Sequence, residues 1–577
     1  MHGSLVRLSI MGITAAFAAG EAAAQTIYPL NKAEILSGSR FDFKVEFPAS
    51  PPAANVSVTI NGRPAADVFG VPAKIIESED GKPLTAYWLR GVSLNDAGNY
   101  KVEAEADGKK SSVTWSVFAT PEGRKAKNVI LFIGDGLSMA HRTAARILSK
   151  GIVEGRYGGD LAIDDMPHMA LISTAGTDSV VTDSANSMSA YTTGHKSCVG
   201  ALAVYCSSNI SNFQHPNVET ITEILKRKTK LAVGVVTNTE IEDATPAAMV
   251  AHTRSRKDYD AIVGMFFEVK PDVMLGGGLP AFRPKPADSK TSESTRNDSQ
   301  DYLTKFKAEG YAFAATNSEL LSEAAKPETR RLLGLFNTKD IDGALDRKFL
   351  KAGSVSKFPD QPDLTDEVKA ALDVLSHNDD GFMLMVESGR IDKYSHALDW
   401  ERAVYDTIML DNAVKLAKDF AAARNDTLII VVADHGQPIS LIGTVDDNSN
   451  QPLLRNRTKV YGDAGFPNYP APGPDGYPAS VDVTRRLALG FAAYPDTCDT
   501  GKPHFDGENK PLATNREACV PPETFKTGNI PEAQDKGVHS GDDVVLTAMG
   551  PGSEQFHGHM ENTRVFRAIA TALGLGQ

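Results

Sequence analysis

The apolar positions of this chain follow two patterns, one before about residue 120 and one after it. In the later part, continuous apolar runs alternate with helix-like stretches, and the runs are NVILFIGDG, LAVGVVT, GFMLMVESG and TLIIVVADHG. Continuous runs of this kind are typical of central strands in a parallel sheet, which helices cover on both faces. We therefore predict an α/β fold with a central, largely parallel sheet flanked by helices.

The earlier part alternates apolar and polar side chains in short segments that Gly, Pro, Asn and Asp separate, as in FDFKVEF, TAYWLRGV and SSVTWSVF. This pattern predicts a small β domain over residues 25–119. Its segment LNDAGNYKVEA resembles the tyrosine corner of immunoglobulin-like sandwiches, although the usual cysteine pair is absent. We favour a packing or spacer role over binding of a partner or glycan, because such a fold alone implies no function.

A polar linker at 120–128 opens the second domain, which we predict to span residues 120–577. Its strand–helix alternation stops between about 436 and 530, where Pro, Gly, Asn and Asp are frequent. We predict a long irregular insertion near the mouth of a site, since loops of this length are usually functional. The chain then returns to a last strand and a final helix from Asn562 to Leu573.

The first 24 residues have the three-part pattern of a secretory signal, with Arg7, an apolar stretch over 8–19 and small residues at 22–24. No later stretch has the length and apolarity of a membrane span. We therefore expect an exported protein, either periplasmic or secreted.

Four cysteines fit export as well, because an even count in an exported chain indicates disulfides. The sequence-local pairs Cys198–Cys206 and Cys498–Cys519 are the simplest of three connectivities. The net charge of −13 argues against nucleic acid or an anionic membrane as the main partner. It does not exclude an anionic substrate, because bound metal ions can reverse the sign locally.

Acidic residues follow the predicted central strands, which is where ligands bind in parallel sheets. Asp135 ends the first run, Glu387 the third, and Asp434 with His435 the fourth. One acidic strand end is ordinary, whereas several in one chain indicate a cation site at that edge.

Asp392 and His396 lie four residues apart, so on a helix they share one face and can hold one ion. His539 is the expected third ligand, and Asp434 with His435 can reach a second ion. Mixed oxygen and imidazole ligands suit zinc. The all-oxygen set of Asp135, Thr245 and Glu387 suits magnesium instead.

The stretch VVTDSANSMSAYTTG places Ser184 at the start of a predicted helix, where backbone N–H groups can hold an anion. Taken alone, Asp183 and Ser184 have the simpler reading of a helix cap. Arg256 and Lys393, taken alone, are solvated charges. We assign ordinary structural roles to five further histidines: His141, His195, His252, His557 and His559.

Taken together, the motifs resemble those of the alkaline phosphatase family from about residue 128 to 577. The matching blocks, in the family's order, include NVILFIGDGLSMAHRTAARIL, VVTDSANSMSAYTTG, VVTNTEIEDATPAAMVAHTRSRKDY, MVESGRIDKYSHA, VVADHG and VHSGDDV. The combined match is far more specific than any single block. Only the insertion after Gly436 and the N-terminal β domain depart from the family.

The resemblance implies a role for each site residue, with two zinc ions (Zn²⁺) and one magnesium ion (Mg²⁺) as cofactors. It implies Asp392, His396 and His539 as ligands of the first zinc, and Asp135, Asp434, His435 and the nucleophile Ser184 as ligands of the second. It implies Asp135, Thr245 and Glu387 around magnesium, with Asp243 ordering water there. Arg256 would grip phosphate and Lys393 would help to hold it. The Asp243 and Lys393 pair is similar to bacterial members.

The implied activity is hydrolysis of small phosphate monoesters through a phosphoserine. Two alternatives stay open: a related phosphodiesterase or sulfatase, and an exported, non-catalytic binding protein that uses its β domain. Family members are often homodimers, although the added β domain could block or replace that interface.

Overall fold

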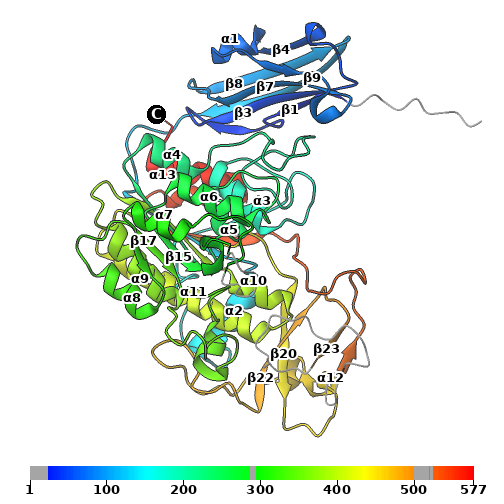
Figure 1. The fold of residues 1–577 in the computed structure, drawn as a ribbon. Helices are drawn as coiled ribbons and strands as arrows, with labels where there is room; N and C mark the ends of the chain where they lie inside the picture. Colours follow the sequence, from blue (N-terminus) through cyan, green and yellow to red (C-terminus); the bar gives the residue numbers. More distant parts are fainter. Residues whose placement is uncertain (1–23, 286–293, 500–518, 520–523, 577) are drawn as a thin grey trace, which may run out of the picture.

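The computed structural model describes residues 24–285, 294–499, 519 and 524–576, so nearly all of the predicted signal segment lies outside the described residues. Its largest element is a ten-stranded sheet (Figure 1). In spatial order the strands are β16 (Ala312–Ala314), β17 (Leu332–Leu335), β15 (Val273–Gly277), β14 (Ala232–Glu240), β18 (Phe382–Ser388), β10 (Asn128–Gly134), β19 (Thr427–Val432), β25 (Val544–Met549), β13 (His168–Ser173) and β26 (Gly558–Glu561). Only β25 runs antiparallel to its described neighbours, β19 and β13. The predicted α/β fold is confirmed.

The four predicted apolar runs form the centre of this sheet as β14, β18, β10 and β19. Every residue of β10, β18 and β19 is buried, which explains why their sequences are continuously apolar. The parallel register pairs Ile133 of β10 with Glu387 of β18 and with Val432 of β19. The residues that follow these strands are therefore brought to one edge of the sheet.

Helices cover both faces of the sheet (Figure 1). Helix α11 (Trp400–Ala422) packs on α2 (Met139–Lys150), α9 (Leu364–Leu375) and α10 (Arg390–His396) on one face. Helix α3 (Ser184–Thr193) packs on α4 (Ile221–Lys228), α5 (Ala244–Ala247) and α13 (Thr563–Leu573), and α6 (Tyr259–Val269) packs on α4. None of the helices in the described ranges combines the length and apolarity that crossing a bilayer requires. The shorter elements are α1 (Ala65–Phe69), α7 (Tyr302–Ala308), α8 (Asn317–Ala324), β11 (Ile152–Val153) and β12 (Arg156–Tyr157).

The N-terminal region forms two small, mostly antiparallel sheets around a core of its own. One sheet contains β1 (Thr26–Tyr28), β3 (Phe41–Pro48), β7 (Leu84–Val92) and β6 (Lys74–Ile76), and the other contains β2 (Glu34–Leu36), β9 (Lys109–Phe118), β8 (Gly98–Ala106), β4 (Val56–Ile60) and β5 (Arg63–Pro64). The Tyr100 hydroxyl donates to the Asp96 carbonyl at 2.8 Å, as a tyrosine corner requires. The β strands are as predicted, and the immunoglobulin-like assignment stays a prediction.

The predicted irregular insertion contains more regular structure than its composition indicates. Strands β21 (Thr458–Lys459), β20 (Ile439–Asp446) and β22 (Arg485–Phe491) form a sheet, and β23 (Thr497–Asp499) pairs with β24 (Thr524–Lys526). A short helix, α12 (Leu454–Arg457), lies between β20 and β21. The prediction of an irregular segment is wrong here because β20 pairs with a strand about forty residues later, beyond the range of local sequence patterns.

Both cysteine pairs that lie close in sequence are bonded, Cys198 to Cys206 and Cys498 to Cys519. The second bridge ties the insertion together. The simplest of the three connectivities is therefore confirmed, and bonded cysteines of this kind are typical of exported proteins.

Candidate active site

The carboxyl edge of the central strands holds the predicted cluster of acidic residues. Asp135 follows β10, and Asp434 with His435 follows β19, while Glu387 is the second-last residue of β18. All four residues are at least 95% buried. The expectation that these strand ends meet is confirmed.

Ser184 reaches this edge from the opposite side, at the first turn of α3. Asp183 caps the helix by accepting from the Asn186 backbone N–H at 3.3 Å, so the simpler cap reading holds for Asp183. The Ser184 hydroxyl is buried and lies 3.3 Å from Nε2 of His435. The helix dipole and the free backbone N–H groups of this turn favour negative charge at that position.

Three oxygen atoms surround Nε2 of His435, each at 3.3 Å: Ser184 Oγ, Asp135 Oδ1 and Asp434 Oδ2. The two carboxylate oxygens are buried and accept no hydrogen bond. Burial, followed by the neighbouring carboxylates, raises the pKa of Asp434 to about 7 and that of Asp135 well above its usual value. Buried polar atoms normally have partners, so this set of lone pairs fits a bound cation.

A second set of donor atoms lies beside the first, on α10 and in the segment before β25. Nε2 of His396 lies 3.1 Å from Asp392 Oδ2 and 3.0 Å from Nε2 of His539. The Nδ1 atoms of the two histidines face carbonyls, that of Gly537 at 2.6 Å and that of Thr182 at 2.8 Å. A carbonyl acceptor holds the proton on Nδ1 and leaves the Nε2 lone pair free. Two imidazoles that present lone pairs to each other and to a carboxylate fit a metal ion.

Gly136 allows these two sets of donor atoms to approach each other. Its φ is +64°, and a Cβ at this position would lie 2.8 Å from Asp392 Oδ1. Its backbone N–H donates to Asp434 Oδ1 at 3.2 Å. A larger residue would therefore displace Asp392, which also accepts from Gln437 Nε2 at 2.5 Å.

The third predicted set consists of oxygen atoms alone. Glu387 accepts from the hydroxyls of Thr237 and Thr239, the latter at 3.2 Å. Burial raises the pKa of Glu387 to about 7, against the lowering effect of the Thr237 and Thr245 hydroxyls. Thr245, on α5, therefore lies beside Glu387 as predicted, and this donor set fits a hard cation such as magnesium.

A chain of alternating charges lines the other side of the site. Arg256 donates to Asp183 Oδ2 at 3.2 Å and to Asp243 Oδ1 at 2.8 Å, while Lys393 Nζ lies 2.8 Å from Asp243 Oδ2. Burial alone would raise the pKa of Asp243, but Lys393 and Arg256 hold it well below its usual value. The guanidinium of Arg256 is thus held by two carboxylates, one on each terminal nitrogen.

Lys393 has a further partner that sequence reasoning missed. Its Nζ lies 2.8 Å from Asp340 Oδ1, and Asp340 Oδ2 accepts from Arg390 at 2.8 Å. Asp340 lies in an irregular segment after β17, where no spacing or periodicity distinguishes it from other surface acids. Only the fold brings it to Lys393.

A cavity of about 400 Å³ opens onto most of these groups. Eight of the predicted residues line it: Asp135, Ser184, Asp243, Arg256, Asp392, Lys393, His396 and His539. The cavity is also lined by Tyr259, Lys339 and Lys536, which are not among the predicted site residues. The remaining predicted residues, Thr245, Glu387, Asp434 and His435, are more deeply buried and contact members of this set. The predicted convergence of distant segments on one pocket is therefore observed.

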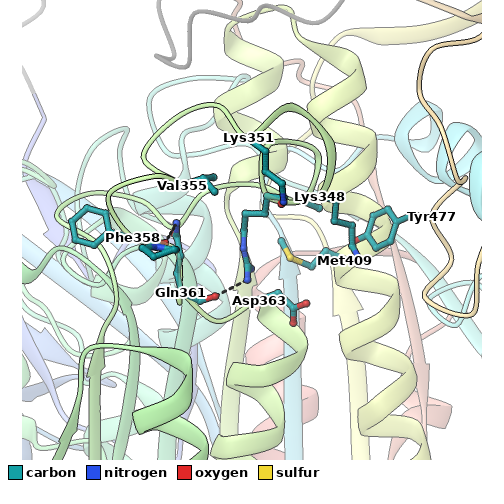
Figure 2. A pocket seen from close by; sticks show the side chains of 11 residues that line it. Lys348, Lys351, Val355, Phe358, Gln361, Asp363, Met409 and Tyr477 are labelled. Carbon is teal, nitrogen blue, oxygen red and sulfur yellow. Dashed lines mark hydrogen bonds between the residues drawn. The ribbon is translucent and has the colours of Figure 1, made fainter.

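A second cavity, of about 200 Å³, lies elsewhere and shares no lining residue with the first (Figure 2). Its cations are already engaged, since Arg347 donates to the carbonyls of Pro362 and Gln361, and Lys348 pairs with Asp475. These cations have partners within the protein. The second cavity therefore lacks, among its described lining residues, the unpaired metal-ligand atoms that the first one has.

A buried serine at a helix N-terminus beside carboxylates and imidazoles defines a metal-dependent hydrolase. The family model described as "Alkaline phosphatase" matches residues 126–575. The chain therefore belongs to the alkaline phosphatase family, whose members use metal ions and hydrolyse phosphate monoesters, and it has this activity.

Individual relatives agree with this assignment. The chain is 29% identical to an alkaline phosphatase of Gadus morhua over 78% of its own length and 93% of the relative. It is 32% identical to the alkaline phosphatase of Escherichia coli (strain K12) over 55% of the chain and 72% of the relative. The solved structure of Thermus thermophilus alkaline phosphatase superposes with a TM-score of 0.56 at 25% identity, over 79% of this chain and 93% of that one.

Proposed function

We propose that the chain transfers the phosphoryl group of a small phosphate monoester to Ser184 and then to water, with two zinc ions and one magnesium ion in the site. The observation that carries this proposal is the placement of Ser184 Oγ beside buried carboxylate oxygens that accept no hydrogen bond, in the same cavity as an arginine that two carboxylates hold. In this assignment Asp392, His396 and His539 hold the first zinc. Asp135, Asp434 and His435 hold the second, together with Ser184.

The magnesium ion is assigned to the oxygen set of Asp135, Thr245 and Glu387, with Asp243 beside it. The ions supply positive charge that offsets the phosphoryl oxygens and favours the ionised form of the serine hydroxyl. Three cations balance the acids that crowd this buried edge, which is consistent with the raised pKa of Asp434 and Glu387 in their absence.

The residues of the chain then have distinct tasks. Ser184 Oγ attacks phosphorus in line and forms the new O–P bond, while the ester oxygen leaves with the bonding electrons and takes up a proton. Water attacks the phosphoserine in a second displacement, which releases phosphate and returns the serine hydroxyl. Arg256 donates two parallel hydrogen bonds to the phosphoryl oxygens, and Lys393 adds a positive charge nearby.

Rapid quenching in acid tests this assignment directly. Incubation with ³²P-labelled phosphate monoester followed by acid should trap label on Ser184 in the unaltered chain and none in Ser184→Ala. Equal labelling of both proteins would exclude Ser184 as the nucleophile.

Metal analysis and substrate comparison test the rest of the assignment. Purified protein should contain zinc and magnesium, lose activity with a chelator and regain it with both ions together. Rates on a phosphate monoester should exceed those on a diester and a sulfate ester. A faster diester or sulfate ester would favour the alternative enzymes, and a metal-free inert protein would favour the non-catalytic one.

We also propose that residues 1–24 direct export to the periplasm or the medium, with residues 25–119 and 120–577 as separate domains of the mature chain. The two disulfides support export. Cleavage of an expressed precursor after Ala24 would test it.

A further inference from the structure

The segment from Cys198 to Glu219 lies between the N-terminal β region and the active site. It follows α3, which begins at Ser184, and its first nine residues are closed into a loop by the Cys198–Cys206 disulfide. In Figure 1 the β region lies over α4 and α13, on the same side of the sheet as α3. One side of this segment therefore faces the β region, and the other faces the active site.

On the inner side, the loop contacts both residues that flank the phosphate position. The Gly200 N–H donates to Asp183 Oδ1 at 3.0 Å, and the Gly200 carbonyl accepts from the Arg256 N–H at 2.8 Å. Leu202 and Thr253 exchange two backbone hydrogen bonds, of 2.8 and 3.1 Å. The loop thus fixes the backbone of Arg256 and one of the two carboxylates that orient its guanidinium.

On the outer side, charged residues of the β region hold the end of the same loop and the residues that follow it. Glu46 accepts from the Ser208 N–H at 2.8 Å and from its hydroxyl at 3.0 Å. Lys44 Nζ, fully buried, donates to Asn209 Oδ1 at 2.5 Å and pairs with Glu46 and Glu79. The Tyr28 hydroxyl donates to the Cys206 carbonyl at 3.1 Å. Every one of these buried charges has a partner, which is characteristic of a fixed interface.

Apolar packing makes this interface continuous with the interior of the larger part. Leu36 and Phe118, from the β region, belong to the core that surrounds the central sheet. Tyr28 packs with Tyr205 and Val218 in a separate buried cluster. Strand β3 also pairs with the segment, because the Asp42 N–H donates to the Asn217 carbonyl at 2.8 Å. The β region is therefore docked on the larger part through a buried apolar and hydrogen-bonded interface.

We propose that the N-terminal β region is a positioning element for phosphate binding, which holds Arg256 in its productive orientation through the Cys198–Cys206 loop. The proposal rests on the role assigned to Arg256 above. None of the described residues of the β region lines the active-site cavity. Loosening its hold on the loop should affect Arg256 and Asp183, which the Gly200 backbone contacts, more than the metal-ligand candidates.

A double-mutant cycle tests this coupling in the full-length, metal-loaded enzyme. Glu46→Ala removes both contacts to Ser208 and the pairing with Lys44. Tyr28→Phe is a milder alternative that removes the hydroxyl's contacts to the Cys206 carbonyl and to Glu46 Oε2. Each should raise the KM for a phosphate monoester and the inhibition constant of inorganic phosphate by about threefold to tenfold, the factor that one net hydrogen bond corresponds to. The kcat should change less than the KM.

The same variants are then measured in an Arg256→Ala background. If the β region acts through Arg256, Glu46→Ala and Tyr28→Phe should have no further effect on phosphate inhibition there. The double variant Cys198→Ser/Cys206→Ser should likewise weaken phosphate inhibition when Arg256 is present and have no further effect in the Arg256→Ala background. Glu105→Ala is a matched control, because Glu105 is an exposed acid of β8 whose charged partner, Lys110, lies within the β region itself.

Equal fold-changes in the two backgrounds would overturn the proposal, and so would an unchanged phosphate affinity in all three loop and interface variants. An Arg256→Ala enzyme that binds phosphate normally would also overturn it, by removing the role of Arg256. In that case trapping of phosphate on Ser184 would still stand as a separate result.

Discussion

Two buried charge clusters of this molecule differ in whether the protein itself supplies partners for the buried charged atoms. In the cluster around Lys44, at the base of the β region, the cation is paired with Glu46 and Glu79 at 2.8 and 2.7 Å. At the sheet edge, Asp135 and Asp434 are equally buried, yet each has an oxygen atom without a hydrogen bond. Burial of charge costs free energy in both places. The first cluster is balanced by the protein, whereas the second requires cations from outside, which marks it as the functional one.

Ser184→Ala should produce the largest effect, and it should affect only the cluster at the sheet edge. It removes the attacking oxygen but none of the carboxylates or imidazoles, so we expect turnover to fall at least about a thousandfold. Zinc and magnesium content, measured by elemental analysis, should stay unchanged. Turnover at the original rate would contradict the nucleophile assignment.

Lys44→Met should act on the free energy of unfolding through the other cluster, and it removes none of the metal-ligand candidates. It leaves Glu46 and Glu79 buried without their cation, and the loss of one partner of a buried pair costs about 3–5 kcal/mol. Chemical denaturation should reveal this loss in both metal-loaded and metal-free protein. Lys101→Met, which breaks an exposed pair with Glu103, is the control and should change stability little. An equal loss of stability in Lys44→Met and Lys101→Met would show that the buried pairing of Lys44 contributes no more than an exposed ion pair.

The pH dependence of the metal-free protein sharpens the comparison further. Folding raises the pKa of Asp434 and of Glu387 to about 7, from ordinary values of 3.8 and 4.5. Between about pH 4 and 7 these two groups therefore bind more protons in the folded chain than in the unfolded chain, so the stability that they contribute falls as pH rises through this range.

Denaturant titrations at several pH values would measure this slope. The loss should be on the order of a few kcal/mol in the metal-free protein and smaller in the metal-loaded one. Asp434→Asn should reduce the slope, because it removes one of the carboxyl groups whose pKa folding raises. A metal-free protein that gains stability between pH 4 and 7 would contradict the raised pKa values.

Asp340→Asn should produce the smallest effect. It keeps the volume of the side chain but weakens the hold on Lys393 and Arg390, so we expect phosphate inhibition to weaken by about threefold to tenfold. The kcat should change less, and Asp340→Glu should restore part of the affinity. A fall in kcat alone would show that Asp340 does not act through phosphate binding.

The sequence by itself determined the central sheet and most of the residues at its edge. Continuous apolar runs specify buried parallel strands, and the acids after them must then meet at one edge, because parallel strands end together. The spacing of Asp392 and His396 specifies one helix face in the same local way. The motif order indicated the family, and the short loop between Cys198 and Cys206 favoured the bridge that forms.

Only the tertiary structure decided which distant groups support that edge. Asp340 reaches Lys393, and the Thr182 carbonyl fixes His539, across separations that no local pattern encodes. The sheet within the insertion and the docking of the β region on the Cys198–Cys206 loop are of the same kind. Local periodicity reports burial and direction along one segment, whereas these contacts depend on how whole layers pack against each other.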